Sequence, residues 1–132
     1  MAAGSFTEEL VDYLVTQGVV TKGTDGFYDH LPDVTTAPVV CLYDNGGLGR
    51  KHNPGAQFSI GVRVRGAVGP GSYEAAQQKA EAVYAEFHRK NNISLELSRI
   101  LYGLADGLPE SIGRDKAKRS LVVFNMTLGA VE

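Results

Sequence analysis

The sequence predicts an α+β domain in which helices pack on one mixed, mostly antiparallel sheet, with the elements in the order α-β-β-α-β-β. Apolar residues recur at helical spacing in two segments, Ser5 to Gln17 and Ser72 to Lys90. Two further pairs of segments have the short apolar runs or the alternation of β-strands. The 132 residues contain no internal repeat or linker, so we expect a single domain, 1–132.

The first expected helix opens the domain and covers the sheet. Its apolar stripe consists of Phe6, Leu10, Val11, Leu14 and Val15. Its polar residues are expected to face water, and these are Thr7, Glu8, Asp12 and Thr16. Ser5 and Glu8 have the spacing of a capping box, and Gly18 is a good helix stop.

The segment from 19 to 36 is rich in Gly, Asp, Thr and Pro. Val19 and Val20 are candidates for a short strand. Asp25, Asp29 and Asp33 lack the alternate-residue ligand spacing of a calcium loop, so we interpret them as solvated loop carboxylates.

The first strand pair encloses a long loop. Ala37 to Tyr43 is a short apolar run that ends in a strong turn signal, Asp44 to Gly47. The second strand alternates apolar and polar residues from Phe58 to Arg65. Between them, Leu48 to Gly55 is basic and rich in glycine, and a loop of this length in a small domain is commonly functional.

The second helix is expected to connect the two strand pairs as a crossover, which would make its flanking strands parallel. Ser72 is the expected N-cap, and Arg89 and Lys90 the expected basic residues of the last turn. The apolar face consists of Tyr73, Ala76, Ala80, Val83, Tyr84 and Phe87. Asn91 and Asn92 are expected to end the helix.

The last strand pair lies within Leu95 to Ala105 and within Ser120 to Leu128, separated by a polar, charged loop, Asp106 to Arg119. In the first strand Ile100, Tyr102 and Leu104 alternate with their neighbours; in the second, Val122, Phe124, Met126 and Leu128 share one face. The opposite face of the second strand carries Leu121 and Val123. A strand that is apolar on both sides is central in a covered sheet or contributes to a subunit interface.

Composition excludes several classes of function. The formal net charge of −2 argues against general binding to nucleic acid or to membrane surfaces. The single cysteine, Cys41, lies in an apolar run and is expected to be a small buried hydrophobic residue. No stretch approaches the roughly 20 apolar residues of a membrane span, and the N-terminus lacks the pattern of a signal peptide.

The sequence also lacks a convincing catalytic or cofactor motif. Gly46 to Lys51 resembles a phosphate loop, but Arg50 precedes the lysine and His52 follows it, where that motif needs glycine and Ser or Thr. The turn Gly66 to Ser72 precedes a helix N-terminus, and we interpret it as structural. The three histidines have no metal-ligand spacing. We therefore expect no enzymatic activity, catalytic residue, metal or cofactor.

What remains are two long charged loops on a rigid body, where binding residues are often found. We predict assembly contacts at the ends and within these loops, and on the second face of the last strand. The candidate residues are Asp44, Asn45, Arg50, Lys51, His52, Arg114, Lys116, Lys118, Arg119, Leu121 and Val123.

Four short motifs, in their order and spacing, resemble those of a known family. They are Pro-Val-Val-Cys-Leu-Tyr-Asp-Asn-Gly-Gly at 38–47, Gly-Val-Arg-Val-Arg at 61–65, Ser-Tyr-x-x-Ala at 72–76 and Pro-x-x-x-Gly-x-Asp at 109–115. From Phe6 to Leu128 the chain is similar to the tail terminator or minor capsid (tail completion) proteins of long-tailed bacteriophages.

This resemblance implies a tail terminator fold and a homo-oligomeric ring, usually of six copies. Such a ring caps the finished tail tube, stops its polymerisation and presents a surface to the head-completion or connector protein. Genome DNA passes through its lumen without sequence-specific binding. The protein would then be found in the tail or neck of the virion, after assembly in the host cytoplasm and without contact with a membrane.

Two alternatives remain at this point. One is another neck or head-completion protein of the same virion. The other is a small cytosolic ligand-binding domain or enzyme that uses the turn Gly66 to Ser72.

Overall fold

The computed structural model describes residues 3–28, 38–44, 56–68, 71–95, 99–114 and 119–131. These contain two helices, α1 (Ala3–Thr16) and α2 (Ser72–Phe87). They also contain the strands β1 (Gly26–Phe27), β2 (Val39–Asp44), β3 (Ala56–Arg65), β4 (Asn91–Ser94), β5 (Arg99–Ala105), β6 (Glu110–Arg114) and β7 (Ser120–Val131). The α+β class is confirmed.

The strands form one sheet in the order β1-β2-β3-β7-β5-β4, and β6 pairs with β7 beside β5. Between the named strands, only β1 and β2 pair in parallel. β3 and β5 both run antiparallel to β7, so they run in the same direction, as expected for strands that flank a crossover helix. β7 is central in the sheet, a position that was one of the two alternatives for a strand with apolar residues on both faces.

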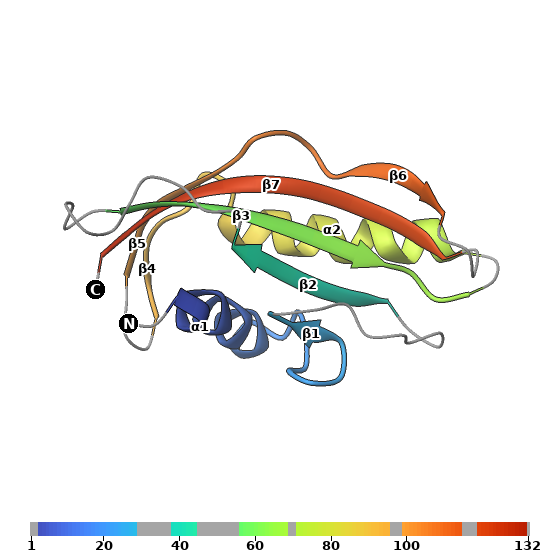
Figure 1. Ribbon diagram of the computed structural model, residues 1–132, viewed down its shortest axis with the longest axis horizontal. Coiled ribbons are helices and arrows are strands. Elements are labelled where there is room, and N and C mark those ends of the chain that lie inside the picture. Colours follow the sequence, from blue (N-terminus) through green and yellow to red (C-terminus); the bar gives the residue numbers. More distant parts are fainter. Residues whose placement is uncertain are drawn as a thin grey trace.

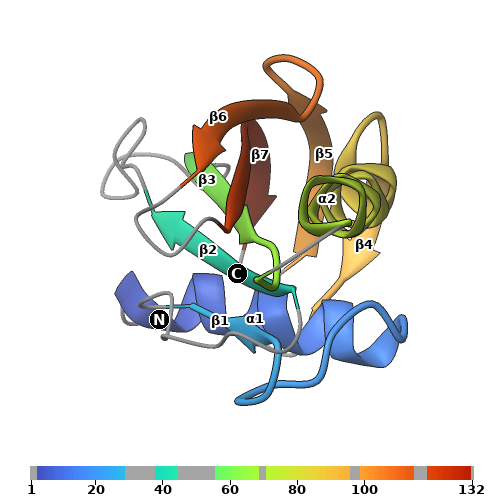
Figure 2. The same ribbon diagram turned by 90° about the vertical axis from the view of Figure 1, so that its right-hand side faces the viewer.

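The sheet is strongly curved, and both helices lie on its concave side (Figure 1). Seen along its length, the sheet wraps around α2, while α1 closes the open side below β2 (Figure 2). α2 packs mainly on β7 and β3, and α1 packs on β2 and β1. The convex side of the sheet, called the outer face below, carries neither helix.

The core fills the space between the curved sheet and the two helices. The alternating residues Phe58, Ile60, Val62 and Val64 of β3 are all buried, opposite Leu128, Met126, Phe124 and Val122 of β7. The Phe6 ring of α1 stacks on Phe58 with centroids 4.1 Å apart. Tyr13 of α1 approaches Phe87 of α2, with ring centroids 5.5 Å apart. The buried faces predicted for these two strands are therefore confirmed.

α1 departs from prediction at its start and in its buried face. It begins at Ala3, so Ser5 lies inside the helix and the predicted capping box is wrong. Thr7 is buried and Val15 is exposed, the reverse of the expectation. Because α1 packs on β1 and β2 while Tyr13 also reaches α2, its buried face is wider than one stripe. Gly18 ends the helix as expected, at φ +78°.

α2 begins and ends differently from the prediction. The N-cap is Gly71, at φ +80°; Ser72 is buried, and its Oγ accepts a hydrogen bond from the backbone N–H of Ser120, 3.0 Å away. The helix stops at Phe87, before the two basic residues that were expected in its last turn. The N–H of Arg89, at φ +58°, donates to the Gly103 carbonyl. The backbone after Phe87 therefore forms hydrogen bonds with β5 instead of continuing the helix.

Three strands were not predicted. β6 lies inside the segment interpreted as a polar loop, and β4 includes Asn91 and Asn92, which were expected only to end the helix. β1 is at Gly26–Phe27, and Val19 and Val20 do not form a strand. All three strands are short, so each contains too few residues to show a clear alternating pattern in the sequence.

The alternation predicted for β5 is also wrong in part. A register shift between Ile100 and Tyr102 moves Gly103 to the buried side and leaves Leu104 exposed. A bulge places two residues against one on the partner strand, so the residues beyond it exchange faces.

Asp25 is paired, so its interpretation as a solvated carboxylate is wrong. Its side chain accepts a hydrogen bond from the Thr21 N–H and lies 3.1 Å from the Lys79 ammonium of α2. Lys79 also donates to the Val19 carbonyl at 2.6 Å, so one ammonium joins α2 to the segment after α1. Asp29 and Asp33 lie outside the described residues.

Cys41 is fully buried, as predicted. Neither of the described helices is long and apolar enough to cross a membrane.

Candidate assembly interfaces

The outer face of the sheet carries the second set of side chains from β2, β3 and β7. Strand alternation places Tyr43, Arg63 and Val123 on this side, opposite to the core residues. In the sheet, Cys41 pairs with Arg63 and Arg63 with Val123. The neighbouring row contains Tyr43, Gly61 and Asn125.

These rows surround a depression of about 350 Å³, called the outer hollow below. Its lining residues are Tyr43, Gly61, Val62, Arg63, Ile112, Val123, Phe124 and Asn125. Gly61 has no side chain to fill the space between Tyr43 and Asn125. The Arg63 guanidinium carbon lies 5.3 Å from the centre of the Tyr43 ring, a distance typical of a cation–π contact.

Exposed apolar side chains continue from the outer hollow along β6 and the turn before it. A second depression of about 240 Å³ shares Val123, Phe124 and Asn125 with the outer hollow and extends to Leu108. Leu108 is 74% exposed, Ile112 54% and Leu104 50%. Clustered exposed apolar residues beside a polar rim are typical of protein–protein contact sites. The outer face therefore has the chemistry of an interface.

Burial raises the pKa of the Tyr43 phenol to about 12, with a smaller contribution from Cys41, while Arg63 and Arg65 act in the opposite direction. The folded state therefore favours the neutral phenol. Its stabilising contribution is complete below pH 10, the ordinary pKa, and is lost as pH rises through about 12.

We accordingly expect the Tyr43→Phe variant to lose less stability than the wild type between pH 10 and pH 12. Urea unfolding at stepped pH values measures this difference, with Tyr73→Phe, an exposed phenol, as the control. Parallel pH curves for wild type and Tyr43→Phe would contradict the expectation.

The candidate residues fall into three groups. Leu121 and Val123 are half-buried on the outer face. Arg119 is only 7% exposed and interacts with another residue, so its guanidinium is not a free surface charge. Asp44 ends β2 and Arg114 ends β6. The remaining candidates, Asn45, Arg50, Lys51, His52, Lys116 and Lys118, lie outside the described residues, as does the loop Leu48 to Gly55.

The two candidate loops join the sheet at opposite ends of β7. At one end, Ala56 of β3 pairs with Ala130; at the other, Arg114 of β6 pairs with Ser120. The 12 residues of β7 extend over roughly 35–40 Å along the strand, and its two ends mark the two ends of the long axis (Figure 1). The strand ends that flank the two candidate loops are therefore far apart in the subunit.

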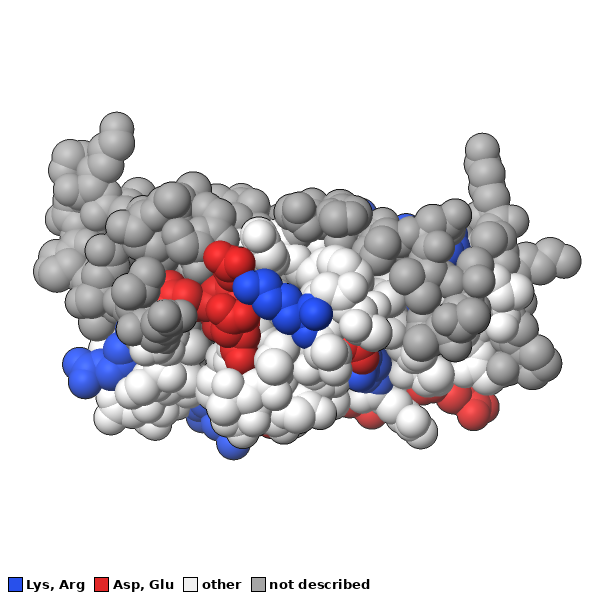
Figure 3. All heavy atoms as spheres, turned by 90° about the horizontal axis from the view of Figure 1, so that it is seen from below, with Lys and Arg blue, Asp and Glu red and all other residues white. Residues whose placement is uncertain are grey.

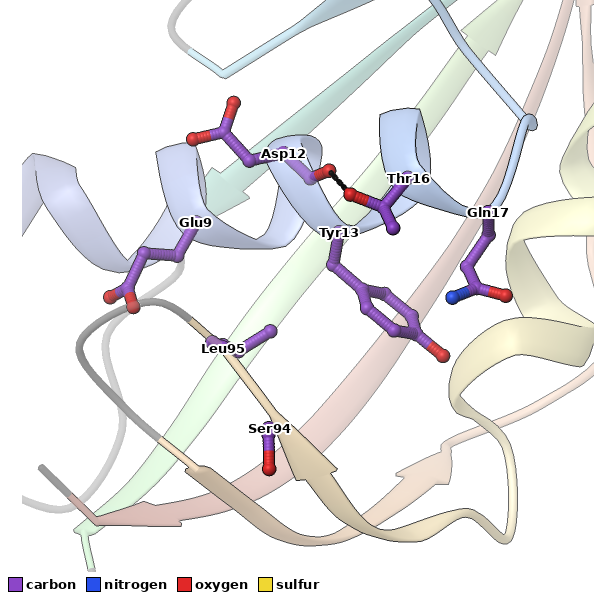
Figure 4. A pocket seen from close by; sticks show the side chains of 7 residues that line it. All are labelled: Glu9, Asp12, Tyr13, Thr16, Gln17, Ser94 and Leu95. Carbon is purple, nitrogen blue, oxygen red and sulfur yellow. Dashed lines mark hydrogen bonds between the residues drawn. The ribbon is translucent and has the colours of Figure 1, made fainter.

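A further pocket of about 340 Å³ lies between α1 and the end of β4. Tyr13 points from α1 toward β4, and Asp12 points to the other side of the helix (Figure 4). The Tyr13 hydroxyl donates to Glu86 of α2 at 3.2 Å; burial, followed by the Glu86 charge, raises the pKa of this phenol. Among the described residues, no group of three His, Cys, Asp or Glu side chains could hold a metal ion.

The outer surface of α1 is acidic. Acidic side chains gather there, with a basic side chain against them, on the face that carries α1 and β1 (Figure 3). Lys22 forms ion pairs with Glu8 at 2.7 Å and Asp12 at 3.2 Å. Both pairs are substantially exposed, so they contribute little to stability.

The comparisons with known proteins agree with this architecture. A protein-family profile described as "Bacteriophage tail terminator protein" matches residues 13–132. The chain belongs to this family. A chain of the solved structure "Virion of native gene transfer agent (GTA) particle" shares its fold, with a TM-score of 0.63 and 16% identity over 100% of both chains. Among curated proteins the comparison found no match.

This tail terminator is thus a structural protein of the phage tail and a component of the virion. Its turn between β3 and α2 has a structural task. The Gly66 N–H donates to the Ser120 carbonyl, and Ser72 Oγ accepts from the Ser120 N–H, so the turn fixes the start of α2 against β7. These contacts give no support to the alternative that the turn binds a ligand or substrate.

Sequence reasoning missed several outer-face residues of the tail terminator. Arg63 was interpreted only as one of the polar residues on the exposed face of an alternating strand. Its contact with Tyr43 could not be predicted, because it depends on the β2–β3 register. Leu108 and Ile112 stood inside a segment that was interpreted as a polar loop. The signal that could have identified them is that they are large apolar residues within a charged segment.

Proposed function

We propose that this tail terminator closes into a ring that caps the tail tube and stops its polymerisation. Six copies, the usual number in the family, is the expected size of the ring. Membership of the tail terminator family over residues 13–132 is the observation that carries the proposal. The opposite side of the ring presents the joining surface for the head-completion or connector protein.

The arrangement of the subunit supports a ring. A head-to-tail contact that closes on itself needs two different surfaces on each copy. The strand ends that flank the two candidate loops lie at opposite ends of β7, and the outer face adds an apolar area between them. A subunit with several chemically different surfaces suits contacts with its own copies, the tube and the connector.

The charge of the chain agrees with a lumen through which DNA passes. Tight binding to phosphates depends on many Lys and Arg contacts. The formal net charge here is −2, so the chain has no overall excess of positive charge to hold the genome.

Replacing Arg50 and Lys51 together by Glu should impair assembly without unfolding the subunit. Charge reversal at a contact introduces repulsion at the interface, whereas substitutions outside the core and its hydrogen-bond networks usually change stability little. Native mass measurement gives the ring fraction, and electron microscopy of tails assembled with the variant shows whether tube length is still controlled. Thermal unfolding checks the fold.

The matched control reverses a second pair of adjacent basic residues, Arg89 and Lys90, which are exposed just after α2. Tails of normal length from the Arg50 and Lys51 variant would remove that loop from the interface. A wild-type chain that stays monomeric even with tail tubes present would overturn the ring itself, and a location on the portal side would assign it to another neck position.

A further inference from the structure

We propose that the outer hollow of one subunit receives the first turn of α2 from the neighbouring copy. Tyr73 of the neighbour would enter the hollow beside Val123, and Glu74 would pair with Arg63. The inference rests on the proposed ring and identifies which two surfaces of the subunit meet in it.

The first turn of α2 is unusual for the apolar groups that it exposes. The helix buries Ala76, Ala80, Val83 and Phe87 against the sheet, yet Tyr73 remains 46% exposed. Val68, in the turn before the helix, is also exposed. Two exposed apolar side chains thus flank the β3–α2 junction. An exposed tyrosine is a common anchor of protein interfaces because it buries a large rigid ring and retains a polar end.

The outer hollow matches the Tyr73 side chain in size and apolar character. Its volume of about 350 Å³ is ample for one aromatic side chain. Ile112 and Val123 supply apolar lining, and Tyr43 supplies an aromatic wall. Inserting Tyr73 would cover Ile112, which is exposed in the single subunit.

The charges of the two surfaces are complementary. Arg63 is the charged residue among those lining the outer hollow, and it is exposed. Glu74 directly follows Tyr73 and is exposed in the first turn of α2. A carboxylate that arrives with the tyrosine would meet the guanidinium at the rim of the hollow, where opposite charges favour association and fix its register.

The two surfaces belong to different parts of the subunit. α2 lies on the concave side of the sheet (Figure 2). The hollow is lined by Tyr43, Arg63 and Val123 of the outer face. Contact between them is therefore head-to-tail, the type of contact that generates a ring when its rotation closes.

A charge exchange tests the inference on the full-length chain. Arg63→Glu alone places two carboxylates together, and Glu74→Arg alone places two guanidiniums together, so each single variant should lose the ring in native mass measurements. Every interface in an alternating mixture of the two variants pairs opposite charges. An equimolar mixture should therefore restore the ring, as should the double variant R63E/E74R for any number of copies.

Control variants reverse charges away from the proposed contact: Glu81→Arg on α2 and Lys90→Glu after it, both exposed in the subunit. These should retain the ring, and thermal unfolding of all variants confirms their folding. Single variants that still assemble, or single variants that lose the ring and are restored neither in the mixture nor in the double variant, would overturn this pairing. Failure of the wild type to form a ring would instead overturn the proposed function.

Discussion

Phe87→Ala should lower the free energy of unfolding by about 4 kcal/mol, the usual range for removing a buried phenylalanine. Phe87 is 1% exposed and is the last residue of α2. Its ring approaches Tyr13 of α1, so it fills the place where both helices meet over the concave face. Truncation leaves a cavity between elements that are each held by the sheet and cannot easily collapse. Urea unfolding followed by circular dichroism measures the loss.

Tyr73→Ala is the matched control on the same helix. Because Tyr73 is 46% exposed, its removal should change the stability of the subunit by less than about 0.5 kcal/mol. The same variant should lose ring assembly if its side chain occupies the outer hollow of a neighbour. Equal losses of stability from Phe87→Ala and Tyr73→Ala would contradict the different environments of these two aromatic residues.

The parts of the fold that were predictable have a pattern that is decided locally. In β3 every second residue is apolar, and this alternation alone separates the core face from the outer face. In β7 the residues at every second position from Val122 to Leu128 share the core face, although Leu121 and Val123 on the other face are apolar as well. α2 was predictable for the same reason, from residues at helical spacing. Leu121 and Val123 were correctly placed on the second face of the last strand, since their positions follow from its alternation.

The parts that were missed depend on a partner distant in the sequence. β6 has no strong pattern of its own and becomes a strand because β7 offers a free edge beside β5. Ser72 has the chemistry of an N-cap, yet its hydroxyl accepts from Ser120, far along the chain, and Gly71 takes the cap position. Tertiary hydrogen bonds override local preference at both places.

The outer hollow could not be predicted because it depends on register. Tyr43 and Arg63 meet only because β2 and β3 pair with Cys41 opposite Arg63. The bulge in β5 then leaves Leu104 exposed, which adds to the apolar area of the outer face. Sequence alternation predicts the face of each residue, but not which residues of adjacent strands lie side by side.

Gly103→Ala should also destabilise the subunit strongly, by about 3 kcal/mol, because the added methyl group meets backbone rather than a movable side chain. A Cβ at this position would lie 2.5 Å from the Phe87 carbonyl oxygen and 2.9 Å from the Leu128 side chain. Relief requires the end of α2 to move away from β5. That movement stretches two backbone hydrogen bonds, from Arg89 to Gly103 and from Gly103 to Lys90.

Gly107→Ala and Gly129→Ala separate this effect from a general cost of replacing glycine. A Cβ at Gly107 meets nothing within 4 Å, so its variant should retain wild-type stability. At Gly129 the added atom meets the side chain of Tyr102 rather than backbone, so the loss should be smaller than at Gly103. The order of the three urea midpoints therefore reports whether contact with the α2 backbone sets the cost. A Gly103→Ala midpoint equal to that of Gly107→Ala would mean that α2 and β5 can separate freely, and that their hydrogen bonds do not fix the end of the helix.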